Sequence, residues 1–240
     1  MNQVSANSTS HSSIQNRSTI RQKLWYDERL DKVFVDRLWA QPDLLISEGT
    51  MLKDGDRSTV VRHDAKDRSY TIKRYKAMGL GHTITHGVLR TRASWSWING
   101  RRVIASGLNT PRPLACLEIR LGPLRGRSFF VSDYIEGEIL LDLVRDGGLD
   151  RARLESLATV MGEIWKTLGQ KGLSHGDMKA TNFIAMDDNS LWLLDLDGMR
   201  QPLVRPWFKR QRAKDRARFM KNWRGLAACE DVFLACVDTA

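Results

Sequence analysis

The sequence predicts an α+β fold with two lobes, on the basis of three observations. Its 240 residues suit one large domain or two small lobes around a cleft. Segments that alternate apolar and polar residues gather in the first 135 residues, whereas apolar residues at helical spacing dominate the remainder. No internal repeat interrupts this order. A strand-rich half followed by a helix-rich half is typical of α+β proteins.

Before residue 90, the sequence predicts a polar tail, one helix and three strands. Residues 1–20 are mostly Ser, Thr, Asn and Gln, so we expect a disordered N-terminal tail over 1–22. Apolar residues at helical spacing then predict a short helix within 24–40. The three strands are LLISEGTM (44–51), STVVRH (58–63) and SYTIKRY (69–75), with a turn around Gly55 between the first two.

After residue 90, two more strands precede a mainly helical half. Apolar residues recur at i, i+3 and i+4 from Leu154 to Leu168, which predicts a helix. The other expected elements are a helix over 90–105, strands over 114–120 and 128–135, a short buried strand over 191–195, and a helix over 207–224.

The net charge of +10 is concentrated in one segment. Residues 200–224 hold ten of the 38 Lys and Arg residues but only one of the 28 acids. Three cysteines at unpatterned spacing argue against a disulfide framework or a zinc site. No apolar run reaches the ~18 residues of a membrane span, and no secretory signal is apparent at the N-terminus. We therefore expect a cytoplasmic protein.

The segment HGDMKATN (175–182) places four polar residues between a predicted buried helix and a predicted buried strand. Phosphoryl transfer needs a carboxylate for the attacking hydroxyl, a cation for the moving phosphate and oxygen ligands for Mg²⁺. Asp177 suits the first role and Lys179 the second, while Asn182 and Asp195 suit the third. We interpret His175 as a buried brace for the loop.

These motifs resemble the protein-kinase-like superfamily over about residues 45–225. HGDMKATN resembles its catalytic loop, and DLD (195–197) stands where its metal-binding triplet would be. The resemblance implies a nucleotide lysine at Lys73, and a bilobal fold with an N-lobe over 23–134 and a helical C-lobe over 135–240. ATP and Mg²⁺ would lie between the lobes.

The same resemblance implies where the nucleotide would be held. The adenine would lie against a hinge near Asp133–Glu136, with Asp133 and Ile135 as the contacts. Gly55, which is first a turn glycine, would contact the phosphates.

Two features depart from the kinase pattern. The turn at 53–57 contains one glycine, where protein kinases carry a glycine-rich phosphate loop. The acid that usually pairs with the strand lysine should fall near Ser96, but no acid lies between Asp67 and Glu118. Lys73 must therefore pair with Asp195, with Glu118 or with the phosphates, and a pseudokinase is an alternative.

Within the superfamily, the chain is most similar to the lipopolysaccharide core kinases, of the Kdo and heptose kinase type. TPRPLACLE, the passage SFFVSDYIEG and the Arg-rich C-terminal end carry this resemblance. It implies phosphorylation of a sugar hydroxyl of the lipopolysaccharide inner core, or of another anionic sugar. A phosphotransferase of the aminoglycoside or choline kinase type is the alternative acceptor class.

The basic segment also suggests a partner. Polybasic stretches bind anionic lipid surfaces, and the aromatic residues Trp207, Phe208, Phe219 and Trp223 could enter the interface. We therefore expect peripheral contact of 205–224 with the cytoplasmic face of the inner membrane. Nucleic acid is unlikely as a partner, because no recognised binding motif accompanies the charge.

Three further residues were considered for the site. Trp95 and Trp97 could stack on a sugar, but large aromatics more often pack in a core. Asp197 is either a second metal ligand or a charge at the turn before Gly198, and we favour the turn.

Overall fold

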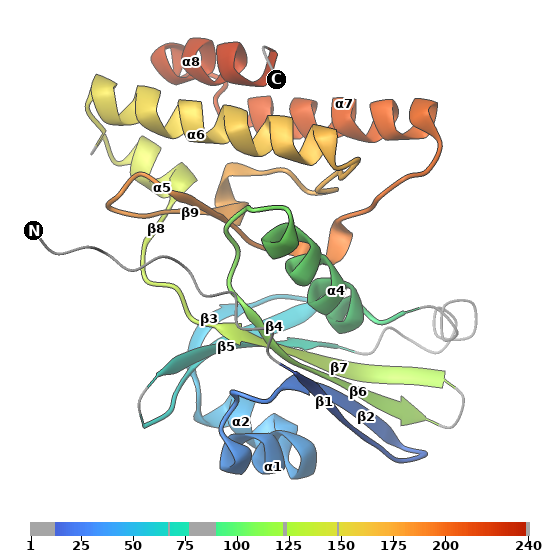
Figure 1. The fold of residues 1–240 in the computed structure, drawn as a ribbon. Helices are drawn as coiled ribbons and strands as arrows, with labels where there is room; N and C mark the ends of the chain where they lie inside the picture. Colours follow the sequence, from blue (N-terminus) through green and yellow to red (C-terminus); the bar gives the residue numbers. More distant parts are fainter. Residues whose placement is uncertain (1–12, 67, 77–89, 122–123, 148, 239–240) are drawn as a thin grey trace, which may run out of the picture.

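A computed structural model describes residues 13–66, 68–76, 90–121, 124–147 and 149–238, and within them the fold is α+β (Figure 1). In chain order the elements are β1 (Ile14–Ser18), β2 (Gln22–Asp27), α1 (Lys32–Ala40), α2 (Pro42–Glu48), β3 (Thr50–Asp54), β4 (Ser58–Asp64), β5 (Ser69–Tyr75), α4 (Arg92–Ala105), β6 (Pro113–Leu121), β7 (Leu124–Asp133), β8 (Glu138–Ile139), α5 (Leu140–Arg145), α6 (Arg151–Gln170), η1 (Ala180–Asn182), β9 (Phe183–Ala185), β10 (Leu191–Leu193), η2 (Leu196–Gly198), α7 (Arg205–Lys221) and α8 (Ala227–Asp238).

The strands of the first half form one seven-stranded antiparallel sheet in the order β1-β2-β6-β7-β5-β4-β3. Strand β5 lies inside this sheet, with β7 on one side and β4 on the other. Lys73 pairs there with Phe130 of β7 and with Val60 of β4. A residue on an interior strand is held by ladder hydrogen bonds on both sides, so the base of the Lys73 side chain is fixed.

Helices cover both faces of the sheet. Helices α1 and α2 lie on one face and α4 lies on the other, toward the C-terminal half (Figure 1). The first face carries a continuous apolar core that includes Phe34, Leu45, Ile72 and Phe129. The buried cluster on the second face is smaller, and in it Trp97 and Tyr75 pack with Cys116. The face of the sheet toward α1 and α2 is therefore covered by the larger apolar core. Part of the face toward α4 remains for the junction with the C-terminal half.

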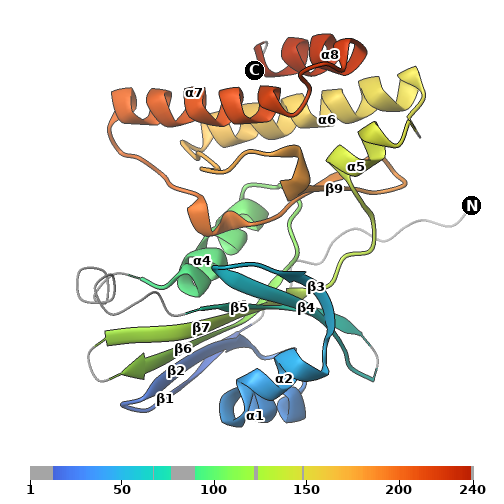
Figure 2. The same ribbon diagram turned by 180° about the vertical axis from the view of Figure 1, so that it is seen from behind.

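The C-terminal half has its own core, built on α6. The buried stripe of α6 runs from Leu154 to Leu168 and packs with α5, α7, α8 and the small sheet β10-β9-β8. Figure 2 shows α6 and α7 side by side at the far side of this half from the large sheet. In the described part of the chain, none of the helices is long and apolar enough to cross a membrane.

Most of the predicted elements are confirmed. Strands β4 and β5, the helix α6 and the helix α7 match their predicted segments within a few residues. The helix predicted over 90–105 is α4, and its first residue follows the cap Thr91, whose side chain accepts from the Ser94 N–H. The strand predicted over 128–135 is β7, which begins earlier than predicted, at Leu124.

Two predictions near the N-terminus are wrong. Residues 14–18 of the predicted disordered tail form β1, whose backbone pairs with β2 although its side chains are mostly exposed; residues 1–12 lie outside the described part. The short helix predicted within 24–40 is α1, over Lys32–Ala40, and the residues before it belong to β2. The strand predicted over 44–51 is mostly α2, which Pro42 begins at a position that favours proline.

Candidate active site

A cavity of about 440 Å³ lies between the large sheet and the C-terminal half. Three of the predicted site residues, Lys73, Asn182 and Asp195, line it together, and Ile135 lines it as well. The lining consists of Leu52, Lys53, Val60, Thr71, Lys73, Tyr75, Ser96, Gly100, Thr110, Pro111, Phe130, Ser132, Tyr134, Ile135, Gly137, Ile139, Thr181, Asn182, Ile184 and residues 193–196.

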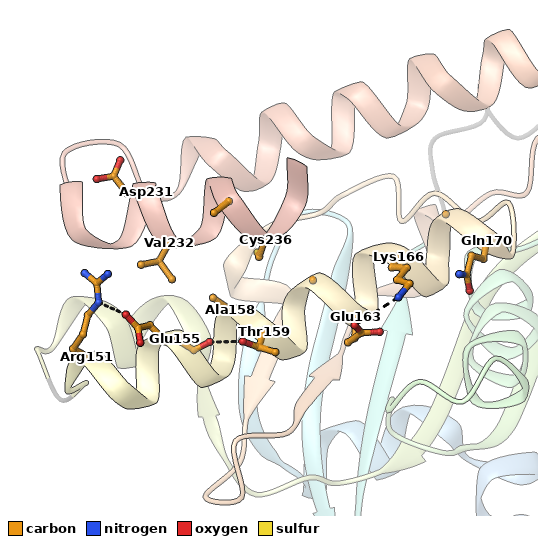
Figure 3. Close-up of a pocket in the computed structure, with 13 residues that line it drawn as sticks. Arg151, Glu155, Ala158, Thr159, Glu163, Lys166, Gln170, Asp231, Val232 and Cys236 are labelled. Carbon is orange, nitrogen blue, oxygen red and sulfur yellow. Dashed lines mark hydrogen bonds and ion pairs between the residues drawn. The ribbon is translucent and has the colours of Figure 1, made fainter. Parts of the chain in front are cut away.

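A larger hollow of about 1010 Å³ lies between α6 and α8 (Figure 3). Its walls carry Arg151 paired with Glu155 and Lys166 paired with Glu163, together with Val232 and Cys236 of α8. These are ordinary helix-surface pairs with exposed side chains, and such pairs have little energetic weight. None of the predicted site residues lies there, so the smaller cavity is the candidate active site.

Lys73 and Asp195 form an ion pair across this cavity. The Lys73 Nζ donates to Asp195 Oδ1 at 2.6 Å, and both side chains are less than a third exposed. Burial acts to raise the pKa of Asp195, but the Lys73 ammonium outweighs it and the pKa is lowered. Of the partners considered for Lys73, Asp195 is thus the one observed. Glu118 instead accepts hydrogen bonds from Thr91 and Ser94.

The backbone around Asp195 is unusual and is held by α4. Asp195 has φ +57° and ψ +52°, in the left-handed region, which costs about 1–3 kcal/mol at a non-glycine residue. Asn99, fully buried on α4, donates through Nδ2 to the carbonyls of Leu196 at 2.8 Å and Met199 at 3.1 Å. These bonds hold the DLD turn so that the Asp195 carboxylate enters the cavity.

Asp177 lies beside the cavity in the loop before η1. Asn182 Nδ2 donates to the Asp177 carbonyl at 2.8 Å and lies 3.4 Å from its carboxylate Oδ2. Lys179 Nζ donates to the same Oδ2 at 2.9 Å. The predicted base, its neighbouring cation and a predicted metal ligand are therefore brought together, and the Asp177 side chain remains one-third exposed.

His175 braces the loop, as predicted. Its ring is fully buried, with Nε2 3.0 Å from the Leu194 carbonyl and Nδ1 accepting from the Asp177 N–H at 3.4 Å. These contacts require the neutral tautomer with the proton on Nε2. Burial lowers the pKa of His175, although the carboxylates of Asp215 and Asp195 act in the other direction.

This burial predicts a loss of stability in mild acid. The folded pKa of His175 is below its ordinary 6.5, so below pH 6.5 the unfolded chain binds a proton that the folded chain does not. The free energy of unfolding should therefore fall as the pH drops below 6.5, by up to about 1.4 kcal/mol per pH unit from this group. Urea unfolding at pH 7.5, 6.5 and 5.5 measures it. His175→Asn should be less stable throughout but should show the shallower slope; equal slopes would contradict the assignment.

Asp215, on α7, accepts hydrogen bonds from the segment that contains HGD, and this role was not predicted from the sequence. It is 1 % exposed and accepts from the Ser174 hydroxyl at 2.7 Å and from the Gly176 N–H at 3.0 Å. From the same helix, Arg218 contacts the Gly176 carbonyl and lies 3.6 Å from Asp177 Oδ1. Asp215 is the single acid of the basic segment 200–224, which was the available signal for a buried role.

Gly176 allows the loop to lie close to the DLD turn. Its φ is +83°, and a Cβ built there would lie 2.4 Å from the Gly198 carbonyl oxygen. A side chain at Gly176 would therefore be strained by its own backbone and would push the two loops apart. The glycine in HGD is thus explained by the close contact between this segment and the DLD turn.

On helix α4, Ser96 lines the cavity at the position where an acid was expected. Ser96 shares a hydrogen bond of 2.8 Å with the Tyr75 hydroxyl. One turn earlier, Arg92 pairs with the buried Asp197 and lies 4.8 Å from the centre of the Tyr75 ring. Burial, with a contribution from Asp195, raises the pKa of Asp197. Asp197 lies in the turn before Gly198, the favoured interpretation from sequence, and it joins this turn to α4.

Two predicted cofactor contacts do not line the cavity. Gly55 lies in the β3–β4 turn, where its carbonyl accepts from Lys76 Nζ at 2.9 Å, and the cavity is reached instead by Leu52 and Lys53. Asp133 is flanked by the lining residues Ser132 and Tyr134, so strand alternation directs its side chain away.

The Asp133 N–H is engaged elsewhere, and its carboxyl lies near several arginines. The N–H donates to the Arg112 carbonyl at 3.1 Å. Burial raises the pKa of the carboxyl, although the cations of Arg68 and Arg112 act to lower it. Lys53 lines the cavity but was not predicted as a site residue, because its place in the turn at 53–57 is its only distinguishing feature in the sequence.

The two tryptophans of α4 have different surroundings. Trp97 is 7 % exposed and belongs to the cluster with Tyr75 and Cys116. Trp95 lies between Arg90 and Arg200, whose guanidinium carbons are 5.9 Å and 4.8 Å from its ring centre. Packing was the favoured interpretation, and for Trp97 it is confirmed.

The residues present suit Mg²⁺ bound with a nucleotide. Asn182 uses Nδ2 as a donor to Asp177, which leaves its amide oxygen as a ligand. Asp195 uses Oδ1 for Lys73, and within the described residues its Oδ2 makes no hydrogen bond. One amide and one carboxylate oxygen in the same cavity are a usual protein contribution to Mg²⁺, which takes its remaining ligands from phosphates and water.

Comparison with known proteins gives one distant similarity. No protein-family model matches the chain. The 3-deoxy-D-manno-octulosonic acid kinase of Photobacterium damsela subsp. piscicida is 22 % identical over 221 residues, which cover 85 % of this chain and 85 % of that protein. At this identity the similarity supports a relationship to kinases, and phosphotransferase activity with it.

Proposed function

We propose that the protein is an ATP- and Mg²⁺-dependent kinase that phosphorylates a sugar hydroxyl of the lipopolysaccharide inner core at the cytoplasmic face of the inner membrane. The observation that supports it most is the meeting of Lys73, Asn182 and Asp195 in one cavity with Asp177 at its side. The fold would be of the protein-kinase-like type, with lobes 23–134 and 135–240. The kinase name of the distant relative supports the same reaction class and acceptor.

The nucleotide would lie along the cavity from Ile135 to Lys73. In the described part of the chain the Ile135 N–H makes no hydrogen bond, whereas the N–H of Tyr134 donates to Ser69 at 3.1 Å. The Ile135 N–H is thus available to an adenine ring nitrogen. Lys73 would contact the phosphates, and Lys53 of β3 supplies a second cation at the same cavity. With a single glycine in the β3–β4 turn, phosphate binding relies on these side chains.

Bound Mg²⁺ would neutralise charge on the transferred phosphate. Asn182 and Asp195 would hold it, and Lys73 would then move from Asp195 toward the phosphates. Asp177 would orient the acceptor hydroxyl and take its proton. Lys179 lies 2.9 Å from Asp177, close enough to contact the γ-phosphate on the same side.

The surroundings of Asp177 favour an anionic acceptor. Lys179 and Arg218 flank its carboxylate, and both side chains are 49 % exposed. A sugar that carries a carboxylate or phosphate near the reacting hydroxyl could pair with either cation. The cationic acceptors of aminoglycoside or choline kinases would be repelled, so that alternative is disfavoured. The pseudokinase alternative rests on the missing acid near Ser96 of α4 and on the single glycine of the β3–β4 turn, and the following experiment decides it.

The test combines nucleotide binding with phosphate transfer. ATP with Mg²⁺ at about 100 times Kd should stabilise the fold by about 2.7 kcal/mol, or roughly 5–10 °C in Tm for a protein of this size. Labelled ATP should then phosphorylate a delipidated inner-core oligosaccharide but not kanamycin or choline. A Tm that is unchanged by ATP with Mg²⁺, together with no transfer, would contradict the proposal in favour of a non-catalytic module.

Arg218 offers a test of the acceptor class. Arg218→Ala should raise KM for the anionic acceptor about tenfold, as expected for the loss of about 1.4 kcal/mol of binding, and should leave KM for ATP unchanged. With the delipidated acceptor, Arg210→Ala, a matched change on an exposed residue of the same helix, should alter neither value. A loss confined to kcat would assign Arg218 to bracing the Gly176 carbonyl instead.

A further inference from the structure

Three large apolar side chains are exposed together just before and within the first turn of α7. Leu203 is 98 % exposed, Val204 58 % and Trp207 54 %. Burying such groups against water-free surroundings is favourable, so a cluster of them on the surface usually marks a contact site. The cluster does not extend along the helix, because Phe219 and Trp223 are fully buried in the C-terminal core. The sequence-based expectation that these two aromatic residues reach a membrane is therefore wrong.

Exposed cations surround the apolar cluster. Arg205, Lys209, Arg210 and Lys214 are all exposed and lie within two turns of Trp207. Not every cation of the segment contributes, because Arg212 turns inward over the Trp165 ring, 3.9 Å from its centre, where burial lowers its pKa to about 10. The N-terminal end of α7 thus presents exposed apolar side chains together with exposed positive charge from the first turns of the helix.

The position of this cluster relates it to the candidate active site. Figures 1 and 2 both show the N-terminal end of α7 projecting at the edge of the C-terminal half, away from α8. Eleven residues separate Trp207 from Arg218, which contacts the catalytic loop, so the two lie about 16 Å apart along the helix. A surface that binds the N-terminal end of α7 would therefore lie close enough to Asp177 for the sugar of a lipid-linked acceptor to approach it.

We propose that Leu203, Val204 and Trp207 insert into an anionic lipid surface while Arg205, Lys209, Arg210 and Lys214 bind its headgroups. This inference rests on the proposed function, for which it supplies the mode of access to a lipid-linked acceptor. Interfacial binding of this kind uses Trp and Leu on the buried side and Lys and Arg at the headgroup level. A nucleic acid would be bound through the cations alone and would leave Leu203 and Val204 in water.

The test measures vesicle binding apart from catalysis. Flotation with vesicles of phosphatidylglycerol and phosphatidylcholine should carry the protein, whereas vesicles of phosphatidylcholine alone should carry at least tenfold less. The double variant Leu203→Ser, Trp207→Ser should bind the anionic vesicles at least tenfold more weakly. Ile20→Ser, which removes an equally exposed apolar residue from the β1–β2 turn, should bind like the wild type.

Charge and activity readouts complete the experiment. Lys209→Ser with Arg210→Ser should weaken vesicle binding, whereas the exposed pair Lys32→Ser with Lys66→Ser in the N-terminal half should not. The apolar double variant should lose transfer to a vesicle-bound acceptor and keep transfer to a soluble one. Unchanged vesicle binding of that variant, or binding of wild type to duplex DNA in preference to vesicles, would overturn the inference. Absence of transfer to both acceptors with normal vesicle binding would count against the proposed kinase alone.

Discussion

Replacement of Asp177 by asparagine is expected to lower kcat for phosphate transfer by about 10²- to 10⁴-fold, the usual contribution of a general base. The amide keeps the size of the side chain and can still accept from Lys179, which lies 2.9 Å from Oδ2. It cannot take a proton from the acceptor hydroxyl. KM for ATP should remain within about twofold, because Asp177 does not line the nucleotide cavity.

The measurement is steady-state transfer of labelled phosphate, with Tm as a check on folding. Asp187→Asn is the matched control, since it makes the same change at an exposed acid in the turn between β9 and β10. Equal kcat for Asp177→Asn and the wild type would remove Asp177 from the reaction, and the proposed function with it.

Replacement of Asp195 by asparagine should abolish the dependence of ATP binding on Mg²⁺. Even changes in residues that support a metal ligand cost about 10- to 100-fold in metal affinity, so loss of the ligand charge itself should cost at least as much. Asparagine is suited to the test because it tolerates the left-handed backbone found at this position, with φ +57°. The effect should therefore report the charge and the Lys73 pair, and the fold should be retained.

Titration of Mg²⁺ at fixed ATP, followed by the change in Tm, gives the metal affinity of each variant. Asp197→Asn provides the contrast, because Asp197 pairs with Arg92 of α4 instead of with Lys73. We expect it to keep wild-type Mg²⁺ affinity while losing some stability. If Asp197→Asn lost the Mg²⁺ response and Asp195→Asn kept it, the two metal-site assignments would have to be exchanged.

The elements that sequence predicted well are those whose pattern and surroundings agree. The apolar stripe of α6 runs for four turns, and all seven of its predicted inward residues are buried. In β5 the alternation of Tyr70 and Ile72 with polar neighbours matches a strand that packs on α1 and α2 on one face. Long periodic segments leave few alternative ways to bury their apolar residues.

The failures lie where short segments depend on their partners. Residues 44–48 have an apolar run that suits either a strand or a helix, and packing against β4 and β5 settles it as α2. Residues 14–18 have no apolar pattern at all, and they become a strand because β2 offers its free edge. Local composition contains no information about an edge that forms only when the rest of the sheet has folded.

The same distinction applies to the site. Asp177, Lys179 and Asn182 lie within six residues, so their chemistry could be recognised from spacing, and Asp195 follows one strand later. Asp215 and Arg218 act on the same loop from about 40 residues away, and Arg92 acts on Asp197 from more than 100 residues away. Contacts at such separations leave no local pattern.

By itself, the sequence determined the α+β class, the main helix, the central strand and the residues that we propose for phosphate transfer. Tertiary structure alone decided that Lys73 pairs with Asp195, that Asp215 is buried behind the loop, and that α7 divides into a core end and an exposed apolar tip. The physical reason is that side-chain chemistry and periodicity are local properties, whereas burial and ion pairing depend on which distant segments the fold brings together.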